Sequence, residues 1–529
     1  MALIVSQIKT TLDEAKDNAV AKALSLLCIK RQQLEEARLY KSSVDARRDI
    51  CFVNSVYIRL KDAALELKLA EKHPNVRLYE AGELSFTFGT QKPDGEIYIA
   101  GFGPAGMFCA LTLCEFGYRP VVLERGADMD SRIKAVEGFW SGGALDRAAN
   151  VQFGEGGAGT FSDGKLTTRI NDPLCSRVLE RFTQFGAPED ILTQAKPHIG
   201  TDRLRGVVKN LRQRITELGG EVRFLSAVEG VTLRSGRVES IRVNGGEIRC
   251  GALALAVGHS AHDTFRMLLE SGAGLVPKPF SVGARIEHLQ SDIDNALYGK
   301  YAGHPALPPA EYQLSYHEGG RGVYTFCMCP GGYVVASASE TGTIVTNGMS
   351  YYDRAGANAN SAVLVSVSPE DMGGGALCGA EFIQRLEQQA YQLGGNSGKA
   401  PASLTREFIS GSGGLTLGRV TPTYSCGVEQ ADLGRLFPEF ISTPLRNGLR
   451  YFDRRIKGFS DSDSILTAIE TRSSSPVRLP RNEAGYAECA DNLYPCGEGC
   501  GYAGGIMSAA VDGIRTAVRI MERYAPPAE

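Results

Sequence analysis

Apolar residues in the first ninety positions follow strand and helix periods in turn. The elements that this pattern predicts are a strand at 2–9, a helix at 10–29, two strands around a polar bend within 36–60, a helix at 61–73 and a strand at 76–82. The β-α-β-β-α-β order is typical of a small ferredoxin-like α+β domain, which we assign to residues 1–92. Because that topology serves many functions, it assigns none by itself.

A second pattern begins at residue 97, in the stretch IYIAGFGPAGMFCALTLCEFGYRPVVLERG. An apolar run, three spaced glycines (Gly101, Gly103 and Gly106), a helix-like segment and a second apolar run ending at Glu124 follow one another. The first glycine permits a tight turn, the second lets backbone approach a pyrophosphate, and the third lets helix and strand pack closely. Phosphates are favoured at the helix N-terminus, where free N–H groups and the dipole attract anions. With Glu124 suited to a ribose diol, this order predicts a dinucleotide site.

The rest of the chain divides by its strand and helix content. Residues 93–278 alternate strand and helix patterns, residues 279–465 are richer in β-like runs such as GVYTFCMC and GYVVASAS, and residues 466–529 return to a glycine-rich loop and a long amphipathic helix. We therefore predict an α/β protein. Its parts are a discontinuous Rossmann-like domain, an inserted β-rich substrate domain and the N-terminal ferredoxin-like α+β domain.

FAD and NAD both use such a glycine turn, so the choice between them depends on distant segments. Residues 150–170 are rich in glycine and small polar residues, which suits the wrapping of an extended cofactor. The strand that runs into Gly258 offers a second close backbone approach. Near the C-terminus, Glu498 lies in a glycine loop before a helix and is suited to a ribityl hydroxyl. These three segments favour FAD. The alternatives are that the first is an ordinary loop, the second a buried strand and the third a helix that only packs on the sheet.

Composition narrows the class of partner and the setting. Lys and Arg (57) nearly balance Asp and Glu (60), which favours a small soluble substrate over general nucleic-acid or membrane binding. Thirteen cysteines in 529 residues do not resemble a secreted disulfide framework, and neither a signal sequence nor a membrane-spanning run is present. We expect a soluble, cytoplasmic protein. Its oligomeric state is not indicated.

Several motifs together resemble one known family. They are VQFGEGGAGTFSDGKLTTRI, HIGTDRL, KPFSVGARIEH, YTFCMCPGGYVVA, ETRSSSPVR and LYPCGEGCGYAGGIMSAAVDGI. With them the chain resembles the flavoproteins with two dinucleotide-binding domains, in particular bacterial FAD-dependent, or NAD(FAD)-utilising, dehydrogenases without an assigned substrate. The resemblance implies noncovalent FAD, with the glycine turn at the pyrophosphate, Glu124 on the adenosine ribose and residues 498–508 near the ribityl chain and ring.

The cofactor residues expected from the motifs and from this resemblance are Gly101, Gly103, Pro104, Ala105, Gly106, Glu124, Arg125, Gly157, Asp163, Gly164, Lys165, Gly258, Glu498, Gly505 and Ile506. No second G-x-G-x-x-G follows a strand in residues 279–465. NADH or NADPH is therefore a candidate for transient electron donation only. A redox pair of cysteines four residues apart after the first helix is also missing, so direct hydride chemistry of the flavin is preferred over a dithiol relay.

The candidates for catalysis are Arg472, Lys165, His259 and Cys329. An arginine orients a carboxylate or stabilises a reduced flavin, and Asp163 is comparable to Lys165. Four histidines occur in motif-like segments, namely His198, His259, His262 and His288. Each is a candidate proton donor, and the alternative for each is a structural role. Cys327 and Cys329 are expected on one side of a strand, but with Cys496 and Cys500 they have an unusual zinc spacing, so no metal is expected.

These observations predict an FAD-dependent oxidoreductase, a dehydrogenase or reductase that acts on an unidentified small organic substrate. Two alternatives stay open. One is a flavin-dependent RNA-modifying or RNA-bound protein that uses the N-terminal domain, whose polar bend carries Lys41, Arg47 and Arg48. The other is a flavoprotein monooxygenase.

Overall fold

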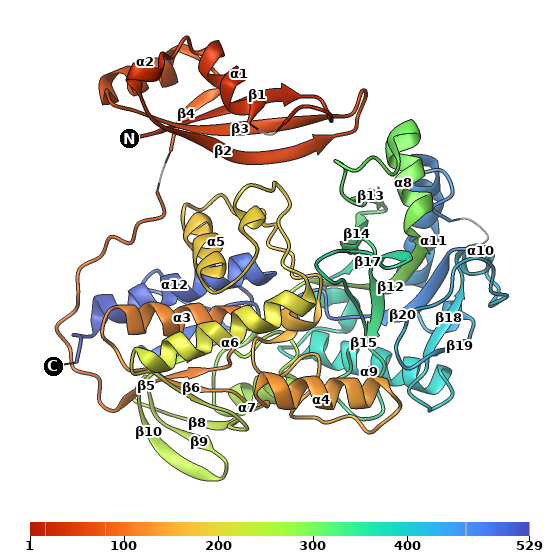
Figure 1. The fold of residues 1–529 in the computed structure, drawn as a ribbon. Helices are drawn as coiled ribbons and strands as arrows, with labels where there is room; N and C mark the ends of the chain where they lie inside the picture. The colour runs from red at the N-terminus through yellow and green to blue at the C-terminus, as the bar shows by residue number, and fades with distance from the viewer. Residues whose placement is uncertain (16, 80, 461–462, 528–529) are drawn as a thin grey trace.

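The computed structural model describes residues 1–15, 17–79, 81–460 and 463–527. Figure 1 shows a small N-terminal domain at the top, an α/β domain at the lower left and a β-rich domain at the right. No helix in this described part of the chain combines the length and the hydropathy needed to cross a membrane.

The N-terminal domain has the predicted order of elements. They are β1 (Leu3–Thr10), α1 (Asn18–Leu26), β2 (Leu34–Asp45), β3 (Cys51–Leu60), α2 (Ala63–Lys72) and β4 (Val76–Leu78), and the sheet order is β2-β3-β1-β4. Helix α1 begins later than predicted, because the Glu14 carboxylate accepts a hydrogen bond from the Thr11 N–H and forms a bend before it. The last strand ends at Leu78. Residues 16 and 80, which fall within the predicted helix and strand, lie outside the described residues.

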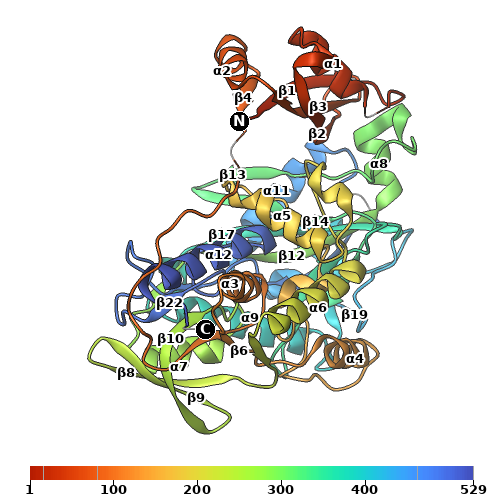
Figure 2. The same cartoon turned by 60° about the vertical axis from the view of Figure 1, so that its left-hand side comes forward.

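Backbone hydrogen bonds on β2 and in the linker attach this domain to the rest of the molecule. On β2, the Ser42 N–H donates to the Thr193 carbonyl at 2.7 Å, and the Ser42 carbonyl accepts from the Ala195 N–H at 2.9 Å. The linker runs down to the end of the last helix, where the Gly89 N–H donates to the Met521 carbonyl at 2.8 Å. Both views show α5 beneath the N-terminal sheet (Figures 1 and 2).

The α/β domain is built on a parallel sheet of order β7-β6-β5-β10-β22. Its strands are β5 (Glu96–Ala100), β6 (Val121–Leu123), β7 (Glu221–Arg223), β10 (Gly246–Leu255) and β22 (Leu493–Pro495), and β8 (Val228–Arg234) and β9 (Arg237–Val243) extend β10 in antiparallel fashion. Its helices are α3 (Pro104–Glu115), α4 (Met129–Trp140), α5 (Leu174–Gln184), α6 (Thr201–Glu217), α7 (His262–Glu270) and α12 (Ile506–Arg523). Because β22 and α12 come from the C-terminal end, the sheet is completed by two distant parts of the sequence.

Helices α3 and α12 pack unusually closely. A Cβ on Gly513 of α12 would lie 2.1 Å from the Ala105 carbonyl oxygen of α3, so only glycine permits this approach. All residues from 105 to 114 are buried. The dinucleotide-type helix is therefore held rigidly between the sheet and the C-terminal helix.

The β-rich domain contains a seven-stranded sheet of order β13-β14-β17-β12-β20-β18-β19. The strands are β12 (Phe280–Leu289), β13 (Ser315–Glu318), β14 (Arg321–Cys329), β17 (Asn358–Val367), β18 (Ala400–Leu404), β19 (Val428–Gln430) and β20 (Ile465–Glu470). Its helices are α8 (Gln290–Tyr298), α9 (Cys378–Leu393), α10 (Thr405–Ser410) and α11 (Glu439–Arg455). Two short pairs accompany it, β15 (Tyr333–Ala336) with β16 (Thr346–Met349) and β11 (Val276–Pro277) with β21 (Val477–Arg478).

The C-terminal limit of the β-rich domain differs from the predicted one. Strand β20 pairs with β12 and β18, although the boundary at 465/466 would assign it to the α/β domain. The boundary therefore lies after β20. The apolar pattern of a strand does not indicate which of the two sheets it joins, because its partner strands are distant in the sequence.

Candidate functional site

A cavity of about 540 Å³ lies where the α/β domain meets the β-rich domain. This volume is within the range of about 300–1,000 Å³ that is usual for small-molecule and cofactor sites. Most of its wall belongs to the α/β domain, and the β-rich domain supplies Phe326, Cys327, Asn347, Arg472 and Ser473. The cavity thus connects the glycine turn with the second sheet.

The structure brings most of the expected site residues to this cavity. Those on its wall are Gly101, Gly103, Pro104, Ala105, Glu124, Arg125, Gly157, Asp163, Lys165, Gly258, His259, Arg472, Glu498, Gly505 and Ile506. Three do not line it, namely Gly106, Gly164 and Cys329. Gly106 lies behind the turn, where an added Cβ would be 2.0 Å from the Gly101 carbonyl oxygen, so its role is close packing.

The three glycines of the β5–α3 turn have different surroundings. Gly101 has a φ of +100°, and a Cβ there would lie 2.4 Å from the Ala256 carbonyl oxygen. At Gly103 a Cβ would meet only the Gly157 Cα, at 3.8 Å, and would project into open space. Pro104 then begins α3, whose first N–H groups have no partners within the helix. Gly101 and Gly106 shape the turn, and Gly103 leaves its cavity side clear.

Glu124 is buried at the end of β6 and orders the backbone around it. Its Oε2 accepts a hydrogen bond from the Phe102 N–H at 2.7 Å, and its Oε1 accepts from the N–H groups of Gly126 and Gly154 at 2.8 and 3.1 Å. Each carboxylate oxygen has two acceptor positions, so Oε2 keeps one for a further donor. Neighbouring Arg125 lies over the Phe153 ring at 4.1 Å.

Arg132, which the sequence analysis did not single out, holds the glycine-rich loop together. The guanidinium is fully buried and donates to the backbone carbonyls of Asn150, Val151, Gly154, Glu155 and Gly157. Its burial lowers the pKa to about 9, a cost that the nearby Glu124 and Glu155 charges offset in part. One side chain thereby fixes five carbonyls of the loop that faces the β5–α3 turn.

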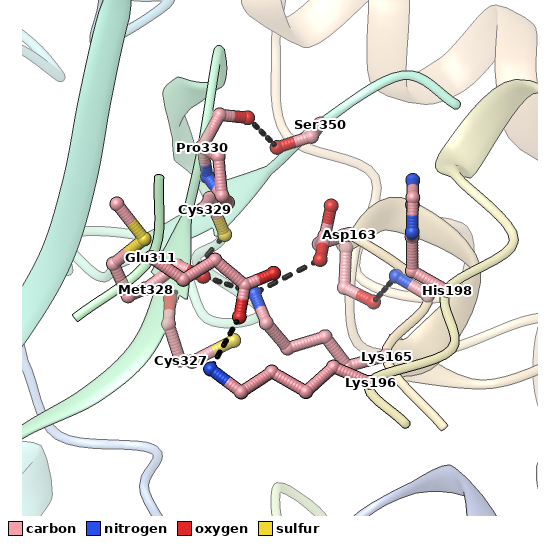
Figure 3. A network of polar contacts seen from close by, with 12 residues as sticks. Asp163, Lys165, Lys196, His198, Glu311, Cys327, Met328, Cys329, Pro330 and Ser350 are labelled. Atoms are coloured by element: carbon pink, nitrogen blue, oxygen red, sulfur yellow. Dashed lines mark hydrogen bonds and ion pairs between the residues drawn. The ribbon is translucent and has the colours of Figure 1, made fainter. Parts of the chain in front are cut away.

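A network of charged side chains crosses from the loop to the β-rich domain (Figure 3). The Lys165 ammonium group contacts the Asp163 carboxylate at 2.9 Å and donates to the Met328 carbonyl. Asp163 also pairs with Arg354 at 2.6 Å, and Arg354 pairs with Glu311 at 2.7 Å. Burial opposes the charge on Lys165, but Asp163 raises the Lys165 pKa above its ordinary value. Lys165 therefore presents a fixed positive charge to the cavity.

Cys327 lines the cavity, whereas the expected candidate Cys329 lies fully buried behind it. The regular alternation expected for β14 is interrupted. Phe326 pairs with Ala362 and Cys329 with Asn360, so one extra residue bulges out of the strand, and Cys327 has a φ of +44°. The bulge turns Cys327 toward the cavity and was not visible in the apolar pattern.

Arg472 lies on the cavity wall opposite the α/β loops and is 6% exposed. Its Nε and Nη2 donate to the Glu387 carboxylate at 2.7 and 2.8 Å. In the described part of the chain, its buried Nη1 has no hydrogen-bond partner. A buried donor without a partner is costly, and an anionic or carbonyl oxygen in the cavity would satisfy it.

Of the four candidate histidines, His259 alone lines the cavity. Its Nδ1 contacts the Ser260 hydroxyl at 2.8 Å. Burial and the nearby Arg472 charge lower the His259 pKa to about 3. The ring is therefore neutral at pH 7 and is a hydrogen-bonding group rather than a cationic proton donor.

The other three histidines have structural partners. His198 Nε2 contacts the Tyr352 carbonyl at 3.0 Å, His262 Nδ1 lies 3.3 Å from Glu340, and His288 Nε2 contacts the Phe459 carbonyl at 2.6 Å. They do not form part of the cavity wall. His262 begins α7 and His288 lies in β12, so these side chains contact groups away from the cavity.

Glu498 faces the cavity from the loop before α12. Burial raises its pKa to about 7, and the charge of Lys278 offsets a part of this effect. The nearby Gly504 and Gly505 have no atom within 4 Å of an added Cβ, so this segment borders open space. A partly protonated carboxyl beside a hollow suits a ligand with hydroxyl groups.

Within the described ranges the cysteines are not gathered into a metal-binding cluster. Cys500 Sγ contacts the Leu255 carbonyl at 3.2 Å, inside the α/β domain. Among the residues that the structure describes, no group of three or more His, Cys, Asp or Glu side chains is arranged to hold a metal ion.

Four charged residues in and around the site carry no signal in the sequence, namely Arg132, Glu311, Arg354 and Glu387. Each is charged, three are buried and Glu311 is half-buried, and each takes part in an ion pair or a set of carbonyl contacts between distant segments. Charged residues in a helix or loop normally indicate exposed surface, so no local signal distinguishes these four. The motif YTFCMCPGG does indicate a cysteine near the site, but the bulge determines that Cys327, rather than Cys329, reaches the cavity.

Comparison with known proteins adds the family. A family model described as "FAD-dependent protein, C-terminal domain-like" matches residues 279–473. An uncharacterised protein of Clostridium beijerinckii is 45% identical over 535 residues, with both chains covered in full. Among solved structures, the amino acid oxidase NikD has a TM-score of 0.37 at 12% identity, covering 82% of this chain and 95% of that one. Glycine oxidase from Bacillus cereus has a TM-score of 0.34 at 11% identity, covering 81% and 98%.

The match with the Clostridium beijerinckii protein extends over the whole of both chains, and the family model ends at residue 473, shortly after β20. The β-rich sheet and the matched region therefore coincide. The chain belongs to the same family as the Clostridium beijerinckii protein, and its residues 279–473 match the C-terminal domain of FAD-dependent proteins.

Proposed function

We propose that the cavity binds FAD noncovalently and that the protein is an FAD-dependent oxidoreductase acting on a small organic substrate held against the β-rich domain. One observation carries the proposal. A single cavity joins the glycine turn at the start of α3 to the charged wall formed by Lys165 and Arg472. A dinucleotide needs both a phosphate site and room for its ring at a distance from that site.

The residues present fit this cofactor. The open space on the cavity side of Gly103, Gly258, Gly504 and Gly505 admits a ligand close to the backbone. The free N–H groups at the start of α3 would hold the pyrophosphate, and the remaining acceptor position of Glu124 would accept from a ribose hydroxyl. Glu498 would meet the ribityl chain. Arg472 Nη1, which is buried and unpaired in the described chain, would donate to a carbonyl or anionic oxygen.

A bound flavin supplies reversible two-electron transfer. The side chains on the cavity wall would bind the substrate and orient it. Lys165 and Arg472 bring two cationic groups to the cavity wall, each also paired with a carboxylate, and such groups would bind a carboxylate or carbonyl oxygen of the substrate. His259 stays neutral and offers a hydrogen bond without adding charge.

The RNA-related alternative draws little support. Arg47 is engaged by Asp45 at 2.8 Å, and β2 uses Ser42 to dock on the α/β domain. On the sheet, Tyr57 is only 2% exposed, so it offers no stacking platform for a base. We therefore retain the oxidoreductase as the proposed function.

The visible absorption spectrum of the purified full-length protein tests the proposal. We expect an oxidised-flavin band, release of the flavin on denaturation, and bleaching during anaerobic titration with NADH or NADPH if a nicotinamide is the donor. Rapid oxygen consumption after reduction would favour the monooxygenase alternative. A folded protein without a flavin band, even after incubation with FAD, would refute the proposal.

A further inference from the structure

Cys327 lies on the wall of the cavity, and Cys329, two residues later, lies directly behind it. The Cys329 Sγ donates to the Cys327 carbonyl at 3.3 Å, so the second thiol lies close to the Cys327 backbone. The bulge in β14 produces this arrangement, because the extra residue and the left-handed Cys327 backbone break the regular spacing of the strand. Cys327 is the sulfur on the cavity side, and Cys329 lies behind it.

The surroundings activate one thiol and leave the other protonated. The hydrogen bond from the Cys329 thiol and the charges of Lys165 and Arg285 lower the pKa of Cys327 below its ordinary value, despite burial. The same hydrogen bond and burial raise the pKa of Cys329. The positive charge of Lys165 acts on both thiols. An attacking thiolate next to a protonated partner is the arrangement that thiol–disulfide chemistry requires.

The other cysteines around the cofactor region differ in this respect. Cys109, Cys496 and Cys500 are buried in the α/β domain, and burial raises the pKa of each thiol. They do not line the cavity. The β14 pair therefore differs from them in combining access to the cavity, a second thiol two residues away and a neighbouring ammonium group.

We propose that Cys327 and Cys329 are a dithiol/disulfide redox pair that exchanges two electrons with the flavin bound in the same cavity. This inference rests on the proposed function for its electron acceptor. The pair replaces, from the β-rich side, the cysteines after the first helix that are missing from the sequence.

The reaction balances without a further reactant. The Cys327 thiolate and the Cys329 thiol lose two electrons and one proton as the S–S bond forms, and an oxidised flavin takes up those two electrons and that proton. The reverse reaction breaks the S–S bond and returns the thiolate and the thiol. Lys165 stabilises the Cys327 thiolate on the reduced side of this exchange.

Redox-poised alkylation of the full-length protein tests the pair without relying on turnover. The protein is equilibrated in glutathione buffers of increasing oxidised fraction, alkylated with iodoacetamide and analysed by intact mass and peptide mapping. We expect the wild type to lose two alkylatable thiols together, with a linked 327–329 peptide. Cys327→Ser and Cys329→Ser each abolish the link, and Cys28→Ser, at an exposed cysteine of the N-terminal domain, leaves it unchanged.

An anaerobic dithionite titration of the holoprotein gives the second readout. The wild type, oxidised beforehand, should consume one more two-electron equivalent per chain than Cys329→Ser. Two free thiols persisting in oxidising glutathione, or a glutathione adduct on Cys327 without the 327–329 link, overturn the inference even if the flavin band is present. A protein that forms the link but binds no FAD would instead refute the proposed function and the electron acceptor with it.

Discussion

Arg472 and Glu387 form a buried two-point ion pair, with Nε–Oε1 at 2.7 Å and Nη2–Oε2 at 2.8 Å. Glu387 lies on α9, and Arg472 follows β20, so the pair fixes a cavity residue to the helix behind it. The geometry leaves one guanidinium nitrogen for the cavity. The pair is thus both a structural contact and the support of a binding group.

Breaking this pair should destabilise the protein more than removing it altogether. We expect Arg472→Met to lower the free energy of unfolding by about 3 kcal/mol, because Glu387 is left buried without its counterion. The double variant Arg472→Met/Glu387→Met should recover most of the loss. Urea unfolding measures both effects. Arg519→Ala, in an exposed pair with Glu522, is the control and should change stability by less than about 0.5 kcal/mol. Equal losses in the single and double variants would contradict this prediction.

The glycine turn offers a pair of variants that separate folding from cofactor binding. Gly103→Ala should fold normally, because its φ of −79° suits alanine and its Cβ enters open space, but we expect FAD to dissociate at least about tenfold more readily. Gly101→Ala should instead lower stability by about 2 kcal/mol or more, because of its positive φ and the contact with Ala256. Flavin fluorescence and thermal unfolding measure the two effects.

A third glycine provides the control for these variants. Gly206 lies exposed within α6 with no atom near an added Cβ, so Gly206→Ala should raise stability by about 0.5–1 kcal/mol and leave flavin affinity unchanged. Unaltered flavin affinity in Gly103→Ala would argue against a pyrophosphate at this turn.

Arg132 should be indispensable for the order of the cofactor loop. Arg132→Met leaves five backbone carbonyls without their donor, and we expect a loss of about 3 kcal/mol or more in stability together with loss of bound flavin. Arg132→Lys should recover little, because an ammonium group has three donors and lacks the planar fork. Hydrogen exchange of residues 150–157 measures the effect. Wild-type protection in either variant would be the contrary result.

Glu498 should give the apoprotein a pH-dependent stability. Burial raises its pKa from 4.5 to about 7 in the folded state, so the folded protein binds more protons than the unfolded chain between these values. The stability that the neutral carboxyl contributes is fully present below pH 4.5 and is lost as the pH rises through 7. One pKa unit corresponds to about 1.4 kcal/mol, and water in the cavity reduces the total to about 1–2 kcal/mol.

Glu498→Gln removes the titrating group and should flatten that part of the stability profile. The free energy of unfolding of the apoprotein at pH 5 and pH 8 in both proteins gives the comparison. If the two profiles fall in parallel between these pH values, Glu498 is not the group responsible.

Local patterns in the sequence were sufficient for the α/β turn and for the N-terminal domain. Gly101, Gly103 and Glu124 are read from spacing alone, because strand, turn, helix and acid lie within thirty residues. The charged wall could not be read in the same way. Arg354 meets Asp163, and Arg472 meets Glu387, across sequence separations of 191 and 85 residues that no periodicity encodes.

The bulge at Cys327 shows a second limit. A period-two pattern places Cys327 and Cys329 on one face of a regular strand, and an inserted residue changes which of them reaches the cavity. The boundary after β20 was missed for a related reason, because strand partners, rather than composition, decide to which sheet an apolar segment belongs.

The parallel sheet of the α/β domain has a consequence for protein synthesis. Strand β22 and helix α12 pair with β10 and α3, which leave the ribosome more than two hundred residues earlier. Gln91, in the linker, likewise accepts a hydrogen bond from Ala525. During synthesis, the edge of β10 that pairs with β22 therefore stays unpaired until translation is almost complete. A truncated chain lacks Glu498, Gly505 and Ile506 of the cavity wall, so premature termination yields a polypeptide that exposes this edge to aggregation and to proteolysis.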